Sequence, residues 1–181
     1  IDDPERFAWD DTADVVVVGF GAAGACAALE ADAAGASVIL VDKFEGGGAT
    51  ALSGGVVYAG ATRFQKEAGF DDTTDEMFKY LSLEVGGIVA PETLRRFCEN
   101  SASNIDWLIG HGATFAGRLA KPDEAYDAAL SAGASLYFSG NEYVRSYAKV
   151  ARPAPRGHIT VGQGFGSKGV HLFAALRKAV V

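Results

Sequence analysis

The chain has 181 residues, of which 49% are hydrophobic and 22% are charged, and its formal net charge is −7 at pH 7. This balance is typical of a globular α/β protein, and the length allows one domain with a sizeable core, or one domain and part of another. The acidic charge and the lack of a basic cluster disfavour nucleic acid as a partner. No apolar run reaches the length of a membrane span.

The first predicted element is a strand over 15–18, because four successive valines are typical of a buried parallel strand. The glycine pattern Gly-Phe-Gly-Ala-Ala-Gly follows over 19–24, and residues 25–34 are predicted to form an alanine-rich helix. A second apolar run over 37–41 predicts another strand, which ends at Asp42. This order of elements is typical of a βαβ unit that binds the ADP half of a dinucleotide.

Each residue of the glycine pattern has an expected role at such a site. Gly19 permits the tight turn, Gly21 lets the backbone approach the pyrophosphate, and Gly24 lets the helix pack close to the strand. The helix N-terminus, which includes Ala22 and Ala23, offers free N–H groups and a positive dipole to the phosphates. We therefore predict that these five residues bind the cofactor.

A second glycine-rich region extends over 44–60, with Gly-Gly-Gly-Ala-Thr at 46–50 and Ser-Gly-Gly at 53–55. Glycine at this density is costly in chain entropy, so the backbone is expected to approach a ligand closely or to adopt positive φ. The alternative is a flexible loop, and the flanking hydrophobic and small residues argue against it.

Three helices are predicted after this region. Thr74 is expected to cap a helix over 75–85, Pro91 to lie in the first turn of the next helix, and residues 101–109 to form a third. Gly-His-Gly at 110–112 ends the third helix, and its histidine suits an interaction at the helix C-terminus. Helices that follow a βαβ unit in this way indicate a domain inserted into, or packed on, the nucleotide-binding domain.

The rest of the chain is less strongly patterned. Residues 116–135 are expected to form a loop, and 136–138 and 143–147 to form short strands or loop anchors. The glycine-rich segment 162–169 is expected to be a helix-entry loop beside the nucleotide site, before a helix over 170–179. Because two strongly predicted strands are too few to bury both faces of a parallel sheet, we expect an incomplete N-terminal piece of a larger protein.

Cys26 and Cys98 are the only cysteines, and neither they nor the histidines show a metal-ligand spacing. Two reduced thiols in the core are expected rather than a disulfide. This usage, with no secretory signal in the sequence, predicts a cytoplasmic protein. His158 lies in a segment rich in proline and glycine, where it is expected either to make an ordinary loop hydrogen bond or to reach the cofactor or substrate cleft.

Several segments resemble the N-terminal part of the fumarate reductase/succinate dehydrogenase flavoprotein superfamily, most strongly over 13–60. Within this superfamily, residues 52–60, 76–81, 91–98 and 155–158 are most similar to the 3-ketosteroid dehydrogenases of the 3-oxo-5α-steroid 4-dehydrogenase type. The resemblance implies an α/β fold with a Rossmann-like FAD-binding domain. Its doubly wound sheet, of the glutathione reductase type, would be incomplete, and part of an inserted α+β substrate domain would accompany it.

This resemblance implies a division of the chain into three segments. Residues 1–60 would hold the βαβ unit and the glycine-rich flavin loop. Residues 61–150 would form a mainly helical segment and the start of the substrate domain. Residues 151–181 would be the return loop and helix of the FAD-binding domain.

The resemblance implies FAD rather than NAD, because in such flavoproteins the second glycine-rich segment runs along the pyrophosphate and the flavin. Asp42 would accept hydrogen bonds from the adenosine ribose, and Lys43 would lie beside the adenine or the ribose. The residues expected near the isoalloxazine and the ribityl chain are Ala49, Thr50, Leu52, Ser53, Gly54 and Gly55. Gly48 is also expected at the cofactor; relatives with covalently bound FAD carry a histidine at its position, so non-covalent FAD is predicted.

The resemblance also implies a reaction. Such an enzyme dehydrogenates a CH–CH bond next to a ketone, here in a hydrophobic 3-ketosteroid, by proton abstraction and hydride transfer to flavin N5. Catalytic residues are expected beyond Val181, and the electron acceptor stays open. The alternatives are fumarate reductase-like reduction of a small unsaturated acid, or a non-catalytic FAD-binding fragment that needs a complementary C-terminal chain. A plain NAD-dependent dehydrogenase is a further alternative, which the second glycine cluster disfavours.

Overall fold

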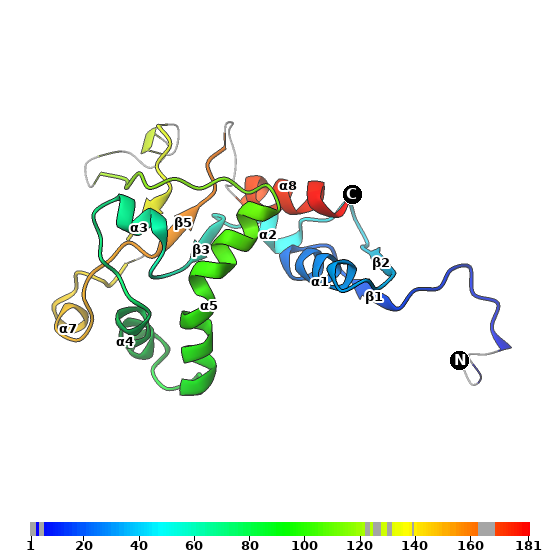
Figure 1. The fold of residues 1–181 in the computed structure, drawn as a ribbon, viewed down its shortest axis with the longest axis horizontal. Coiled ribbons are helices and arrows are strands. Elements are labelled where there is room, and N and C mark those ends of the chain that lie inside the picture. Colours follow the sequence, from blue (N-terminus) through cyan, green and yellow to red (C-terminus); the bar gives the residue numbers. More distant parts are fainter. Residues whose placement is uncertain are drawn as a thin grey trace.

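The structure is a computed structural model that describes residues 3, 6–121, 124, 128–129, 132–138, 140–162 and 169–181. Figure 1 shows the arrangement of its elements. The strands are β1 (Val15–Val18), β2 (Val38–Val41), β3 (Val56–Tyr58), β4 (Leu136–Tyr137) and β5 (Gly157–Ile159). The helices are α1 (Ala22–Ala33), α2 (Gly48–Leu52), α3 (Arg63–Glu67), α4 (Thr74–Val85), α5 (Pro91–Gly110), α7 (Arg145–Ala148) and α8 (Gly169–Val180).

Strands β1 and β2 form a parallel pair joined by α1, which confirms the predicted βαβ unit. Val15 lies opposite Val38, and the register continues without a bulge to the ends of both strands. Helix α1 begins at Ala22 rather than at residue 25, because the N–H group of Ala22 finds an acceptor in the hydroxyl of Thr50, 3.0 Å away. The glycine turn is therefore shorter than predicted.

The prediction that the first strand is buried is not confirmed within the described residues, because Val15 and Val17 are only half-buried. Val17 lies toward α1, since its side chain is 3.4 Å from the position of a Cβ built on Gly24. Val16 and Val18 alternate to the opposite face and are 60% and 83% exposed. Within the described residues, α1 thus covers one face of the parallel pair and the other face is open.

A second sheet, which the sequence patterns did not predict, is antiparallel with the strand order β3-β5-β4. Its central strand carries His158, which lies opposite Val57 on one side and Leu136 on the other. The prediction that His158 lies in a loop is therefore wrong. The strand expected at 136–138 is confirmed as β4, and its pairing with β5 explains why so short a segment is ordered.

The two helices predicted from Pro91 to residue 109 are one continuous helix, α5. Its buried positions include Leu94, Cys98, Ile105 and Leu108, which recur at the spacing of a single helical face. Pro91 lies in the first turn, as predicted. Helix α4 packs against α5 and crosses it, since Figure 1 shows α4 nearly end-on and α5 along its length.

One expected helix cap is wrong, and of the two alternatives for 143–147 the strand is wrong, whereas aromatic anchors are present. The cap of α4 is Thr73 rather than Thr74, since its hydroxyl accepts a hydrogen bond from the N–H group of Glu76 at 3.2 Å. Residues 143–147, expected to be a strand or loop anchors, include the first part of α7. One turn of helix suffices there because Tyr147 packs against Tyr80, with ring centroids 5.5 Å apart.

Other local expectations are confirmed. His111 caps the C-terminus of α5, and its Nδ1 lies 2.9 Å from the carbonyl oxygen of Trp107. Cys26 and Cys98 are both free thiols, the first half-buried and the second buried. In the part of the chain that the structure describes, no helix combines the length and apolarity needed to cross a membrane.

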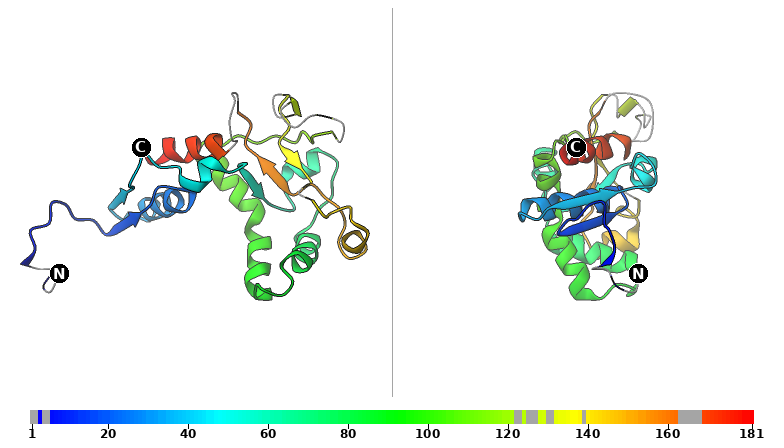
Figure 2. Two further views of the ribbon diagram at one scale, coloured as in Figure 1. Left: turned by 180° about the vertical axis from the view of Figure 1, so that it is seen from behind. Right: turned by 90° about the vertical axis from the view of Figure 1, so that its right-hand side faces the viewer.

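Helix α8 returns to the start of the chain and packs against both α1 and α2 (Figure 2). Its Phe173 meets Phe20 edge to face, with ring centroids 5.1 Å apart. Ile105 and Leu108 of α5 belong to the same hydrophobic core as these two rings. This core holds α8 against the glycine turn that follows β1.

Candidate cofactor-binding site

The turn between β1 and α1 requires glycine at two of its positions. Gly19 has a φ of +104°, a region that residues with a side chain rarely adopt. A Cβ at Gly24 would lie 1.8 Å from the carbonyl oxygen of Gly19, far inside contact distance. The first glycine pattern therefore brings the start of α1 against the end of β1, as its sequence predicts.

The second glycine-rich segment lies directly against this turn. The N–H group of Gly47 donates to the carbonyl oxygen of Phe20 at 2.6 Å, and Thr50 accepts from Ala22 as described above. A Cβ at Gly46 would lie 2.6 Å from the ring of Phe20. Two motifs that are separate in the sequence thus form one continuous backbone surface.

Asp42, at the end of β2, joins the same surface through its carboxylate. One oxygen, Oδ2, accepts from the N–H group of Phe20 at 2.6 Å, and Oδ1 accepts from the N–H group of Phe44 at 2.7 Å. The hydrogen bond from Phe20, followed by that from Phe44, lowers the pKa of Asp42 below its ordinary value. The carboxylate is exposed, and each oxygen retains a lone pair that can accept a further hydrogen bond.

The predicted flavin-side residues lie on α2 and the turn that follows it. Ser53 caps the C-terminus of α2, where its hydroxyl donates to the carbonyl oxygen of Thr50 at 2.8 Å and accepts from the N–H group of Gly55 at 3.1 Å. Gly55 has a φ of +70°, so this turn also requires glycine. Gly48, Ala49, Leu52 and Gly54 belong to the same stretch, and Leu52 is 85% exposed.

Lys43 differs from the other candidate residues in its surroundings. Its side chain is exposed, and its ammonium group lies 5.5 Å from the centre of the Phe44 ring. The Lys43 side chain therefore lies near the aromatic ring of Phe44, next to Asp42 in the sequence, rather than against the backbone of the two glycine segments.

Sequence reasoning expected the entry of this helix beside the nucleotide site, but it assigned no role there to Gly169, the first residue of α8. The N–H group of Gly169 donates to the carbonyl oxygen of Ser53 at 3.1 Å. A Cβ at Gly169 would lie 2.0 Å from the carbonyl oxygen of Thr50, so α8 can begin here only with glycine. The glycines of 162–169 were the available signal, but residues 163–168 of that segment lie outside the described residues.

The residues present fit a ligand with a pyrophosphate group. Helix α1 points its N-terminus into the joined glycine segments and carries no acidic residue in its first turn. The free N–H groups and the dipole of a twelve-residue helix attract an anion. A Cβ at Gly48 would meet no atom within 4 Å, so the backbone there is open to a ligand.

This α/β fold and its two joined glycine segments define the class of protein. Residues 14–164 match the FAD binding domain family, so the chain belongs to that family, and its cofactor is FAD. The chain is 46% identical over 176 residues to 3-oxo-5-alpha-steroid 4-dehydrogenase from Comamonas testosteroni, which covers 96% of this chain and 32% of that protein. It is 36% identical over 130 residues to urocanate reductase from Eggerthella lenta, which covers 71% of this chain and 21% of that protein.

Solved structures of a ketosteroid dehydrogenase and a fumarate reductase are also similar to the chain. The 3-ketosteroid-delta4-(5alpha)-dehydrogenase from Rhodococcus jostii RHA1, in complex with 4-androstene-3,17-dione, superimposes with a TM-score of 0.87 at 34% identity, over 97% of this chain and 37% of that one. A flavocytochrome c3 fumarate reductase superimposes with a TM-score of 0.70 at 30% identity, over 94% of this chain and 25% of that one. The chain thus spans about a third of the length of the steroid dehydrogenases it matches.

We expect replacement of Asp42 by asparagine to weaken FAD binding. An amide oxygen can accept one of the two backbone N–H groups, while the amide nitrogen would face the other and displace it. The dissociation constant for FAD should rise about tenfold or more, as for the loss of one charge-assisted hydrogen bond. The measurement is a titration of FAD followed by flavin fluorescence.

Asp32→Asn, at an exposed position of α1, is the control for this variant and should bind FAD as the wild type does. Equal FAD affinity of the Asp42→Asn and Asp32→Asn variants would contradict the role of Asp42.

Proposed function

We propose that the chain is the FAD-binding portion of an oxidoreductase that dehydrogenates the CH–CH bond next to the ketone of a 3-ketosteroid. The observation that carries this proposal is the 46% identity over 96% of the chain to a 3-oxo-5-alpha-steroid 4-dehydrogenase. The TM-score of 0.87 with a structure that holds a steroid supports it. The substrate is then a small hydrophobic molecule.

In this proposal, the residues of the chain hold and orient the cofactor. The start of α1, with Gly19–Gly24, takes the pyrophosphate, and Asp42 receives the ribose on its exposed side. The stretch 48–55 lines the flavin and the ribityl chain. FAD, when bound, supplies the acceptor for a hydride from the substrate carbon. Gly48 offers no side chain for a covalent bond, which supports non-covalent FAD.

Tyr58, Tyr137 and His158 of the second sheet serve packing in this proposal. The hydroxyls of Tyr58 and Tyr137 are buried, and His158 is fully buried. We therefore assign no proton transfer to them, and the base and the acid are expected in the part of the relatives that this chain does not span.

The division of the chain at residues 60 and 150 stays a prediction. Strand β3 of the first segment pairs with β5 of the third segment, so these two segments are in contact.

A fumarate reductase-like reaction is the second candidate. The flavocytochrome c3 fumarate reductase matches 94% of the chain, and NADH:fumarate oxidoreductase from Klebsiella pneumoniae is 43% identical over 101 residues. A small unsaturated acid would need basic groups to bind its carboxylates, whereas a steroid would need an apolar pocket.

An assay with two substrates tests the proposal. The protein that contains this chain is loaded with FAD and given a 3-oxo-5α-steroid with an artificial electron acceptor, or fumarate with a reduced electron donor. Reduction of the acceptor by the steroid alone is the expected result. Turnover of fumarate alone would favour the second candidate. Tight FAD binding with neither turnover until a complementary chain is added would favour the fragment alternative.

A further inference from the structure

Strand β3 begins directly after the candidate flavin residues Gly54 and Gly55. It is held on one side by β5, where Val57 lies opposite His158. Just past the end of β3, the N–H group of Ala59 donates to the carbonyl oxygen of Arg156 at 2.9 Å. The position of the two glycines therefore depends on how firmly β3 is attached to β5.

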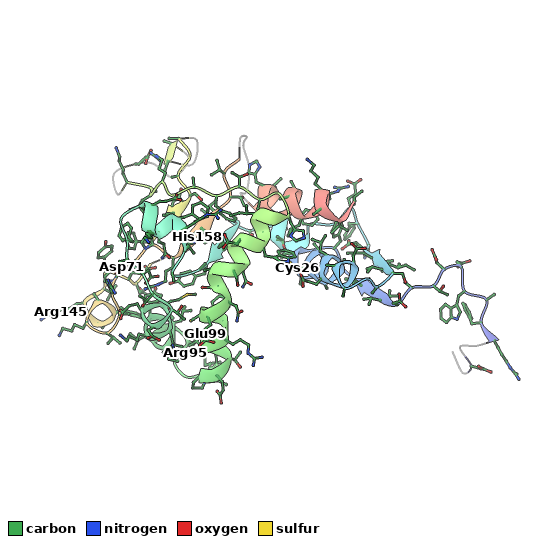
Figure 3. The ribbon with its side chains drawn as sticks, viewed as in Figure 1. Cys26, Asp71, Arg95, Glu99, Arg145 and His158 are labelled. Atoms are coloured by element: carbon green, nitrogen blue, oxygen red, sulfur yellow. The ribbon has the colours of Figure 1, made fainter. Side chains whose placement is uncertain are left out.

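His158 is fully buried at the centre of this attachment (Figure 3). Its ring packs near the rings of Phe64 and Phe115, with centroids 6.3 and 6.4 Å away. Nδ1 lies 3.0 Å from the carbonyl oxygen of Arg156, which can only accept, so Nδ1 carries the proton. Burial lowers the pKa of His158, which favours the neutral ring.

In this neutral tautomer the other ring nitrogen, Nε2, is an acceptor, and its partner is the hydroxyl of Thr62 at 2.9 Å. Thr62 also caps α3 in a reciprocal arrangement with Gln65, and Gln65 donates to the carbonyl oxygen of Pro155 at 3.0 Å. The segment from β3 to α3 is thus tied to β5 by side chains as well as by the strand ladder.

The same connection holds a strained residue. Ala61, between β3 and Thr62, has a φ of +56°, the only positive φ of a non-glycine residue among those described. Such a conformation persists only where the surroundings enforce it. The hydrogen bonds of Thr62 on one side and of Ala59 on the other provide that constraint.

We propose that the His158–Thr62 pair is a positioning element of the cofactor site. It fixes the exit of β3 and so holds the backbone of Gly54 and Gly55 in the geometry that FAD requires. This inference rests on the proposed site. It assigns His158 and Thr62 no contact with the cofactor, and their effect passes through β3.

The test compares three variants of the chain. Thr62→Val keeps the shape but removes the hydroxyl, and Thr62→Ser restores it. Thr73→Val is the matched control, since it removes an exposed capping hydroxyl that accepts its hydrogen bond from Glu76 of the same helix, α4. Two quantities are measured: the dissociation constant for FAD, and the hydrogen-exchange rate of the Ala59 amide without FAD.

We expect Thr62→Val to raise the dissociation constant and the Ala59 exchange rate each by about tenfold, as for the loss of one buried hydrogen bond. Thr62→Ser and Thr73→Val should remain close to the wild type in both quantities. Equal FAD affinity of Thr62→Val and Thr73→Val would overturn the proposal and leave Thr62 an ordinary helix cap. If the wild type itself binds no FAD, the proposed site fails first, and this inference fails with it.

Discussion

Replacement of Gly24 by alanine is expected to abolish FAD binding. The added Cβ would lie 1.8 Å from the carbonyl oxygen of Gly19, and that oxygen belongs to the backbone, which cannot rotate away as a side chain would. To make room, α1 must move off β1, and its N-terminus then loses its position in the glycine turn. An FAD titration measures the effect, and far-UV circular dichroism reports whether the helices remain.

Gly110→Ala is the matched control for this variant. Gly110 is the last residue of α5, it has no positive φ, and a Cβ there would meet no atom within 4 Å. It should bind FAD as the wild type does. Wild-type affinity in the Gly24→Ala variant would show that α1 does not need its close approach to β1 to hold the cofactor.

The second large effect is expected at the buried ion pair of Asp72 and Arg156. Both side chains are inaccessible to solvent, and the guanidinium donates through Nε and Nη2 to the two carboxylate oxygens at 2.8 and 2.6 Å. Replacement of Asp72 by asparagine would leave a buried cation without its counter-charge, which costs about 3–5 kcal/mol of unfolding free energy. Denaturant unfolding followed by circular dichroism measures this loss.

The neighbouring residue supplies the control for the ion pair. Asp71, which is labelled in Figure 3, lies 3.8 Å from Arg152, and its side chain is 94% exposed according to its accessible surface. Asp71→Asn should leave the unfolding midpoint unchanged, because solvent screens such a pair. An unfolding curve for Asp72→Asn that overlaid the curve for Asp71→Asn would mean that solvent reaches Arg156 and that the pair contributes little.

The parts of the fold that the sequence predicted are those with local patterns. The βαβ unit has four valines, a glycine turn and an alanine-rich helix in succession. These signals are adjacent in the sequence, so each can be recognised without knowledge of distant contacts. The second sheet has no such pattern, because β3 and β5 are three residues long and Val57 pairs with His158 across most of the chain. Strands this short take their stability from tertiary pairing rather than from propensity.

Helix α5 illustrates a different source of error. Its middle turn contains Glu99 and Asn100, which are polar and exposed and which separate the apolar residues of the two predicted helices. The buried face nevertheless continues through Cys98 and Ser101. Following the buried face alone, rather than all apolar residues, would have predicted one helix.

The candidate site shows the same contrast. Gly19, Gly24 and Gly55 were identifiable because glycine leaves a direct trace of a backbone requirement in the sequence. Phe20 and Gly169 lie in segments that were expected at the site, but their roles were not identifiable, since these come from contacts with residues of other elements. The hydrogen bond from Ala22 to Thr50, which joins the two glycine segments, is likewise a tertiary contact with no local signal.

The central claim is that this chain holds FAD without a covalent bond, and the visible spectrum of the purified chain after addition of FAD and desalting tests it most directly. We predict flavin absorption bands that persist through desalting and leave the protein completely on denaturation. A folded chain that shows no flavin bands in the presence of excess FAD, or bands that remain with the denatured polypeptide, would contradict the account.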